Sequence, residues 1–145
     1  MKIMKHKFVE YMPNTIENGI LYISLEFGTI LHKCVCGCGN EVNTPLSPTD
    51  WKMIYDGESI TLKPSIGNWS FDCKSHYWIR NNSIVWDEKW DVNKIEMARK
   101  SEVIDRLNYF NLNENQLKSN NKYVVNEPIK NYKKKKWSLL KFLFG

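Results

Sequence analysis

Several features that mark whole classes of protein are missing from this sequence. The chain has 145 residues and contains no run of about 18 apolar residues, so we expect no membrane-spanning helix. Residues 1–13 are charged and end at a proline, without the apolar stretch of a secretory signal. Internal repeats are also absent. We therefore predict a cytoplasmic protein whose four cysteines are reduced.

The net charge of +5 comes from the end of the chain. Residues 132–145 hold five of the 21 basic residues and no acidic one, so the rest of the chain balances 16 basic against 16 acidic residues. Nucleic-acid-binding domains spread basic charge over a folded face, so we expect no specific nucleic-acid binding. The lysines precede an apolar end, Trp137 to Phe144. Such a tail can pack on its own domain, contact a partner protein or bind peripherally to an anionic membrane.

The apolar pattern predicts a β domain followed by a helix. Alternating apolar residues predict strands within 7–12, 20–25, 31–36, 51–55, 60–62, 77–80 and 83–86, with loops at 43–50 and 64–70. Asp56-Gly57 is typical of a hairpin turn. After Trp86, apolar residues recur at helical spacing and predict an amphipathic helix over about residues 92–109, with Asp91 as its N-cap.

Four cysteines and one histidine have the spacing of metal ligands. Cys34, Cys36 and Cys38 lie close together in a glycine-containing segment, and Cys73 and His76 form a Cys-x-x-His pair. Thiolate and imidazole are the ligands that Zn²⁺ prefers, normally four in a tetrahedron. We predict one zinc ion held by four of these five side chains. Buried cysteines without a metal and disulfides are the alternatives.

The surplus of ligands, to which His32 adds a sixth, favours a structural zinc over a catalytic one. A catalytic zinc keeps one position open to water and needs a nearby general base. Asp50 and Glu58 are the nearest carboxylates in sequence. A capping or turn Asp and a surface Glu are the structural alternatives for these two residues.

A serine nucleophile is a second candidate chemistry. Ser65 lies in a Pro-Ser-Ile-Gly-Asn segment, where backbone N–H groups and the side chain of Asn68 could form an oxyanion site. His76 is placed to serve as the base, but it cannot both bind zinc and accept a proton. Its neighbour Ser75 would point to the opposite face of a strand. A purely structural turn is the alternative for this segment.

Four sequence motifs carry a family resemblance. CGCG, TPLSPTDW, PSIGNW and CxSHYWI occur intact and in order between residues 7 and 87. In these motifs the chain resembles a family of small bacterial proteins called domain of unknown function 6527. Members of that family tend to be encoded beside a ubiquitin-like protein, a ThiF-like E1 enzyme and an E2-like protein. The resemblance implies these proteins as partners and leaves open a role in antiphage defence.

The resemblance and the residues together predict a fold class and two functions. We expect an α+β protein with a mainly antiparallel, zinc-stabilised β domain at 1–90, a helix at 91–110, and a linker with a basic tail at 111–145. The resemblance implies a zinc-binding component of a bacterial ubiquitin-like conjugation pathway, acting as a peptidase that processes or deconjugates the ubiquitin-like protein. A non-enzymatic zinc-binding adaptor that recruits the ubiquitin-like protein or its target is the alternative.

Overall fold

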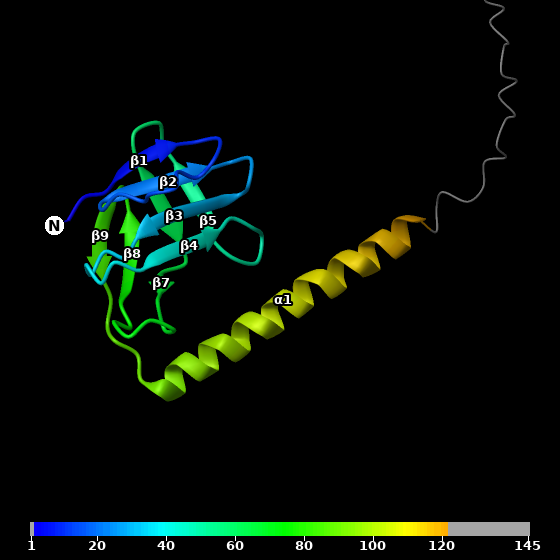
Figure 1. Ribbon diagram of the computed structural model, residues 1–145. Coiled ribbons are helices and arrows are strands. Elements are labelled where there is room, and N and C mark those ends of the chain that lie inside the picture. The colour runs from blue at the N-terminus through cyan, green and yellow to red at the C-terminus, as the bar shows by residue number, and fades with distance from the viewer. Residues whose placement is uncertain (1, 122–145) are drawn as a thin grey trace, which may run out of the picture. The chain divides into compact units, whose positions relative to one another are not determined.

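The computed structural model describes residues 2–121 (Figure 1). The chain divides into two compact units, Met1–Tyr109 and Phe110–Gly145. The predictions made for the basic tail fall outside the described residues. Nine strands and one helix follow one another in the described part: β1 (Lys5–Phe8), β2 (Ile20–Ser24), β3 (Thr29–Lys33), β4 (Glu41–Pro45), β5 (Lys52–Tyr55), β6 (Ile60–Lys63), β7 (Ile66–Gly67), β8 (His76–Arg80), β9 (Ser83–Trp86) and α1 (Val92–Asn121).

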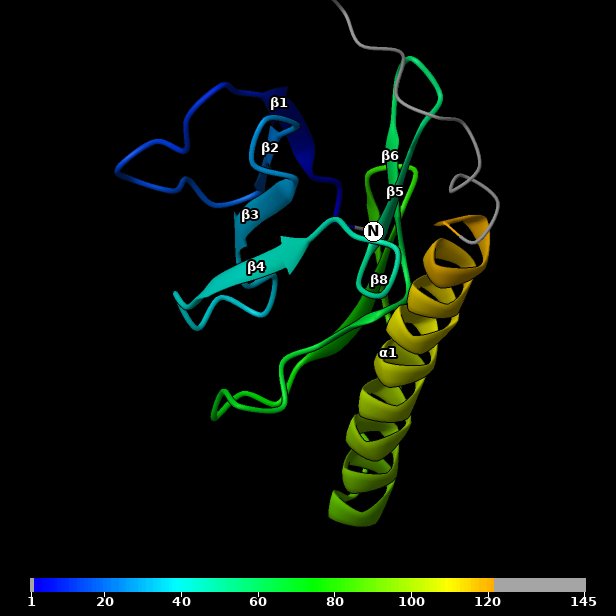
Figure 2. The same ribbon diagram turned by 90° about the vertical axis from the view of Figure 1, so that its right-hand side faces the viewer.

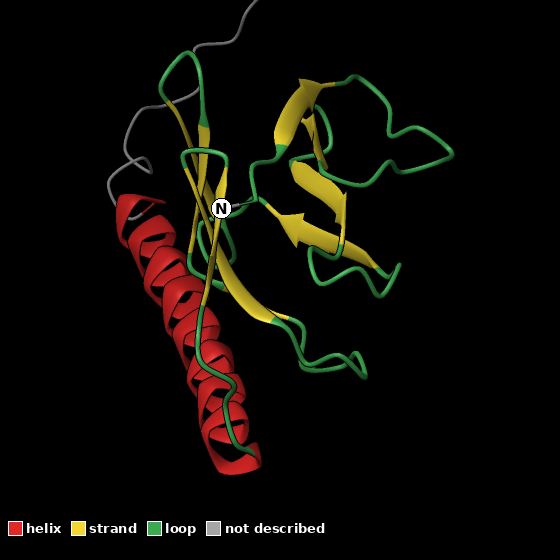
Figure 3. Ribbon diagram, turned by 90° about the vertical axis from the view of Figure 1, so that its left-hand side faces the viewer, coloured by secondary structure: helices red, strands yellow, loops and turns green. Residues whose placement is uncertain are grey.

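The strands form three small sheets within the first unit. One has the order β1-β2-β3-β4, the second is the hairpin β5-β6, and the third has the order β7-β8-β9. All neighbouring strands are antiparallel except β1 and β2, which run parallel. The strands, the loops and the helix are distinguished by colour in Figure 3. This architecture confirms the predicted α+β class with a mainly antiparallel β domain followed by one helix.

The core lies between two layers of strands. Figure 2 shows the β1–β4 sheet on one side and β5, β6 and β8 on the other. Side chains from both layers form one buried cluster: Met4, Leu21, Ile23, Ile30, Cys34, Val35, Val42, Ile60, Leu62, Ile66, Tyr77, Ile79 and Ile84. Burying each large aliphatic side chain contributes about 1.5–3 kcal/mol, so this cluster holds the two layers together.

Two predicted loops contain short strands instead. The end of β4 falls within residues 43–50, and Pro45 is tolerated there because β4 is the edge strand of its sheet. The two residues of β7 fall within residues 64–70. A strand of two residues is too short to show alternation, so its pairing with β8 could not be read from periodicity.

The helix begins where predicted and extends further. Asp91 caps it, since its Oδ1 accepts a hydrogen bond of 2.8 Å from the backbone N–H of Lys94. α1 continues to Asn121 rather than ending near residue 109. Residues 111–121 were expected to be linker because they are rich in Asn. They contain no Gly or Pro, however, and their Leu, Glu, Gln and Lys residues favour a helix.

Only the first turns of α1 bury apolar side chains. Ile95 is buried and Ala98 is half-buried, whereas Val103, Ile104 and Leu107 are exposed. The apolar spacing that predicted an amphipathic helix therefore corresponds to a packed face only near the start of α1. Within residues 2–121, no helix combines the length and apolar character needed to cross a membrane.

Candidate functional site

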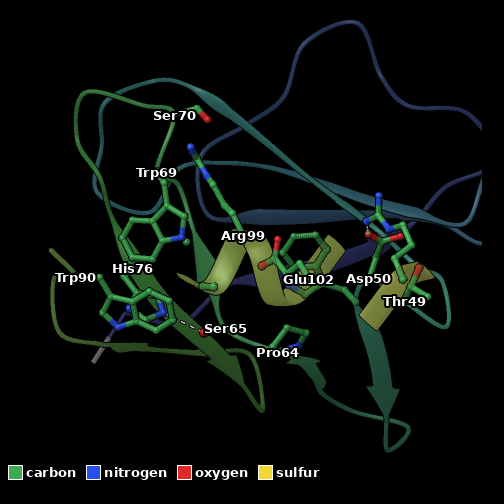
Figure 4. A pocket seen from close by; sticks show the side chains of 14 residues that line it. Thr49, Asp50, Pro64, Ser65, Trp69, Ser70, His76, Trp90, Arg99 and Glu102 are labelled. Atoms are coloured by element: carbon green, nitrogen blue, oxygen red, sulfur yellow. Dashed lines mark hydrogen bonds and ion pairs between the residues drawn. The ribbon is translucent and has the colours of Figure 1, made fainter. Parts of the chain in front are cut away.

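Ser65 and His76 are brought together by the pairing of β7 with β8. Gly67 lies opposite His76 in the register, so alternation places the side chains of Ser65 and His76 on the same face of the sheet, diagonally across the two strands. The Ser65 hydroxyl oxygen lies 2.9 Å from His76 Nε2 (Figure 4). A hydroxyl at hydrogen-bonding distance from an imidazole nitrogen is the arrangement of an activated serine nucleophile.

The other nitrogen of His76 is fixed by the chain that follows β9. His76 Nδ1 lies 2.9 Å from the backbone carbonyl oxygen of Glu88. Since a carbonyl can only accept, Nδ1 carries the proton and donates it. Nε2 of the neutral ring is then free to accept the proton of the Ser65 hydroxyl. The backbone of Glu88 therefore selects the tautomer that a general base requires.

A carboxylate lies beside the same imidazole. Asp87 Oδ2 is 3.6 Å from His76 Nε2, and it accepts a 2.8 Å hydrogen bond from the indole N–H of Trp78. That indole bond, followed by the backbone N–H of Glu88, holds the pKa of Asp87 below its usual range. Asp87 is thus ionised near neutral pH, and its negative charge favours the positive charge that His76 acquires on taking a proton.

Two tryptophans cover the buried histidine. Trp69 stacks on Trp90 with ring centroids 5.2 Å apart and an angle of 20° between the planes. Both rings contact the imidazole of His76, with centroid distances of 5.0 Å and 4.8 Å. Only 2% of His76 is exposed. Water is therefore largely excluded from the imidazole, while Ser65 is half-buried and remains reachable.

The absence of a side chain at residue 67 makes room for this arrangement. A Cβ placed on Gly67 would lie 2.3–2.5 Å from three atoms of the Trp69 indole. Such a separation is well below an ordinary van der Waals contact, so the indole occupies the space that a larger residue would fill. Gly67 of the PSIGNW motif thus allows Trp69 to pack directly on β7.

Ser65 and His76 open into a cavity of about 340 Å³. Figure 4 shows Trp69, Trp90 and the Ser65–His76 pair at one end, with Arg99 and Glu102 of α1 beside them. The cavity is lined by residues of the β4–β5 loop, β7 and its flanks, β8, the segment between β9 and α1, and the N-terminal half of α1: Thr49, Asp50, Trp51, Pro64, Ser65, Gly67, Trp69, Ser70, His76, Trp90, Ala98, Arg99, Glu102 and Arg106. This volume lies at the lower end of the range for ligand-binding pockets.

The four cysteines meet at a separate place. Cys34, Cys36 and Cys38 come from the turn between β3 and β4, and Cys73 comes from the loop between β7 and β8. Their Sγ atoms all lie within 4.8 Å of one another, and all four are free thiols. In a tetrahedral zinc site with Zn–S bonds of about 2.3 Å, neighbouring sulfurs are about 3.8 Å apart. The four side chains therefore have the number, chemistry and spacing to hold a metal ion.

Local hydrogen bonds already favour negative charge at part of this cluster. The backbone N–H of Asn40 lowers the pKa of Cys38 to about 7, while burial raises the pKa of Cys34. The hydroxyl of Ser75 lies 3.2 Å from Cys34 Sγ, and the amide of Asn68 lies 3.7 Å from it. Such donors stabilise thiolates bound to a metal and fix their orientation.

The structure divides the predicted metal ligands into two groups. The four cysteines cluster, whereas His76 contacts Ser65 and lies outside the cluster. His32 is also outside it, with Nε2 2.9 Å from the hydroxyl of Tyr77. Burial lowers the pKa of His32 to about 4, so this ring is neutral near neutral pH. The conflict between zinc binding and base chemistry at His76 therefore does not arise.

The remaining candidate residues lie in different surroundings. Asp50 lines the cavity, but its carboxylate binds Arg106 at 2.6 Å and Ser47 at 2.5 Å. Glu58 is exposed in the β5–β6 turn and does not line the cavity. Asn68 is buried on the opposite face of β7 from Ser65, where its amide donates to Ser75 Oγ at 2.8 Å. Among the described residues, no hydrogen bond joins any of these three side chains to Ser65.

Three residues of the site were missed by the sequence analysis: Asp87, Trp69 and Trp90. A signal for Asp87 existed in the Asn81-Asn82 turn, because a two-residue hairpin pairs Tyr77 with Trp86. One further step along this register places Asp87 opposite His76, and its backbone N–H does donate to the carbonyl of His76 at 3.0 Å. The tryptophans gave no comparable signal, because both lie outside the strands and the helix.

The fold and the site define a small β protein with a Ser–His pair in a cavity and a separate four-cysteine cluster. A family model described as bacterial ubiquitination-like system serine protease (BubE) matches residues 8–87. This range covers more than half of the chain and contains the four cysteines, Ser65, His76 and Asp87, and the chain belongs to this family. The family links the chain to bacterial ubiquitination-like systems, as the resemblance in its motifs implied. Searches of curated proteins and of solved structures gave no match.

Proposed function

We propose that this chain is a serine peptidase that processes or deconjugates the ubiquitin-like protein of a bacterial conjugation pathway. Ser65 is the nucleophile and His76 is the general base. The observation that carries the proposal is the 2.9 Å contact between Ser65 Oγ and His76 Nε2, in a ring whose Nδ1 is held by the carbonyl of Glu88. The description of the family as a serine protease supports the same chemistry.

The contacts of the two residues support a two-step acyl transfer. His76 Nε2 accepts the hydroxyl proton while Ser65 Oγ attacks the carbonyl carbon of the scissile bond. The protonated ring is stabilised by the Asp87 carboxylate at 3.6 Å, and it returns the proton to the leaving group. Water then hydrolyses the serine ester with His76 again as the base. Asp50, Glu58 and Asn68 have no role in this scheme, since their side chains are engaged elsewhere or lie outside the cavity.

The aromatic cover supports cleavage after a small residue. Trp69 and Trp90 occupy the space above His76, next to the hydroxyl of Ser65 (Figure 4). A bulky side chain on the residue that supplies the scissile carbonyl would compete with these rings for that space. A terminal glycine, which the resemblance to ubiquitin-like systems implies for the substrate, adds no side chain there.

The cysteine cluster supports a structural zinc ion in this proposal. When bound, zinc neutralises the cysteine thiolates and ties the β3–β4 turn to the β7–β8 loop. Four cysteine sulfurs would complete a tetrahedral zinc site and leave no position for a water molecule. The β7–β8 loop carries Trp69 and joins the strand after Ser65 to the strand that begins with His76. The cluster therefore supports the site through the fold rather than through the reaction.

The test is cleavage of a purified ubiquitin-like precursor, extended beyond its terminal glycine, by the zinc-loaded chain. Ser65→Ala should reduce the rate by several orders of magnitude while leaving zinc content and melting temperature unchanged. Ser101→Ala is the matched control, because Ser101 is exposed on α1 and lies outside the cavity. This variant should retain the full rate.

Metal exchange separates the serine mechanism from a metal-activated water. Cd²⁺ binds thiolates as a soft ion, so the cadmium form should fold and cleave at a rate close to that of the zinc form. A rate that follows the identity of the metal, with Ser65→Ala still active, would contradict the role given to Ser65. A folded, zinc-loaded chain that cleaves neither precursor nor conjugate would support the adaptor instead.

A further inference from the structure

The strand beside the nucleophile has an unpaired edge. β7 is the edge strand of the sheet β7-β8-β9, and Gly67 lines the cavity next to Ser65. Within residues 2–121, no hydrogen bond involves the backbone N–H or C=O of Gly67. Unpaired groups on a strand edge are a template for pairing with another extended chain. An edge of this kind inside a cavity can receive a substrate.

The register shows where the free groups of Gly67 point. In an antiparallel pair, hydrogen-bonded and non-hydrogen-bonded residue pairs alternate. The backbone N–H of Asn68 donates to the carbonyl of Ser75 at 2.9 Å, so the adjacent pair, Gly67 and His76, is of the non-hydrogen-bonded kind. The carbonyl of His76 accepts from Asp87 of the chain after β9 instead. The N–H and C=O of Gly67 are therefore directed away from β8, toward the free edge.

We propose that the substrate binds as an additional β-strand on this edge, through both backbone groups of Gly67. The proposal rests on the proposed function and assigns the binding mode of its substrate, an extended peptide segment that ends at the scissile bond. The segment runs antiparallel to β7, with the residue that supplies the scissile carbonyl (P1) beside Ser65. The residue two positions earlier (P3) then lies opposite Gly67 and exchanges two hydrogen bonds with it.

The sequence around β7 determines which part of the substrate can pair. In the other direction the next position with this orientation is Lys63, which belongs to β6 and already pairs with Lys52 of β5. Pairing therefore extends only from Ser65 toward Gly67, on the side of the substrate that keeps the P1 carbonyl. This side is the same for every target of one ubiquitin-like protein, whereas the leaving group changes from one target to the next. A single binding mode then serves both processing and deconjugation.

The test removes single backbone N–H groups from the substrate. The probes are ubiquitin-like proteins with semisynthetic tails, in which an ester replaces the amide N–H of either P3 or P2. In an extended strand the N–H of P2 points away from β7, so the P2 ester is the matched control. One hydrogen bond contributes about 0.5–1.5 kcal/mol, so the P3 ester should lower kcat/KM about 2- to 10-fold. The P2 ester should change kcat/KM by less than 2-fold.

Binding of the same probes to Ser65→Ala is measured by fluorescence polarisation, independently of cleavage. A P3-selective loss of affinity supports the pairing even if no probe is cleaved by the unmodified chain; in that case only the proposed function fails. Equal losses at P2 and P3, a loss at P2 alone, or no binding of any probe would overturn the pairing. Cleavage with equal kcat/KM for all probes would overturn it while leaving the proposed function intact.

Discussion

Replacing Gly67 by alanine should displace the aromatic cover of the site. The new Cβ would lie 2.3 Å from the Trp69 indole, against an ordinary contact of at least 3.4 Å, so the ring must move by about 1 Å. The φ of Gly67 is not positive, and the backbone itself can accept alanine. Contacts of Trp69 with Trp90 and His76 are therefore what the substitution disrupts.

The size of the effect follows from these two ring contacts. Aromatic pairs contribute about 0.5–1.5 kcal/mol each, so their loss costs about 1–3 kcal/mol. Alanine gains back about 0.5–1 kcal/mol, because it loses less backbone entropy than glycine on folding. We expect Gly67→Ala to lower the free energy of unfolding by about 0.5–2 kcal/mol. Urea denaturation of the zinc-loaded chain measures this difference directly.

A second variant shows whether Trp69 is the cause. In a Trp69→Ala background the methyl group at residue 67 meets no indole, so Gly67→Ala should there be neutral or slightly stabilising. The coupling between the two substitutions measures the clash without other contributions. If Gly67→Ala costs the same with and without the tryptophan, the packing of Trp69 on β7 is not what requires glycine.

Two further predictions concern the cysteine cluster and the β5–β6 turn. Cys73→Ala should abolish binding of about one zinc per chain and destabilise the β domain, because metal-binding energy is partly folding energy. A metal-free variant that melts at the wild-type temperature would contradict this prediction. Hydrogen bonds from the backbone N–H of Glu58 and then from Ser59 lower the pKa of Asp56 to about 2. The ionised carboxylate of Asp56 therefore stabilises the fold at any pH above the ordinary pKa of an aspartate. This contribution is lost as the pH falls from about 4 to 2. Asp56→Asn should therefore lower the melting temperature at pH 7 and make the melting temperature fall less steeply below pH 4. If the melting temperature of the variant falls as steeply with pH as that of the wild type, Asp56 does not stabilise the fold in this way.

Most strands could be predicted from the sequence because they alternate apolar and polar residues. β3 and β6 each bury every second residue, which is the pattern that periodicity detects. β7 could not be found in this way, since two residues carry no period. Its existence depends on pairing with β8, and long-range pairing is not encoded in local composition. The far end of α1 was missed because an Asn-rich composition was given more weight than the absence of Gly and Pro.

The candidate site was predictable in its residues but not in its grouping. Cys34, Cys73, Ser65 and His76 were all identified from motif chemistry, yet sequence spacing placed His76 with the cysteines. The three-residue interval between Cys73 and His76 suggested shared ligation. The structure instead places His76 at the start of a strand, so its side chain faces Ser65, while its neighbour Ser75 faces Cys34. Because side chains alternate between the two faces of a strand, neighbours in sequence such as Ser75 and His76 belong to different sites.

Covalent labelling of Ser65 tests the central claim most directly. The zinc-loaded chain is treated with a fluorophosphonate, and the modified residue is identified by peptide mass spectrometry. The account predicts one adduct, on Ser65, which is lost in His76→Gln because the neutral amide cannot take the hydroxyl proton. No adduct on the folded chain, an adduct on another serine, or labelling of Ser65 that is undiminished in His76→Gln would contradict a nucleophile activated by His76.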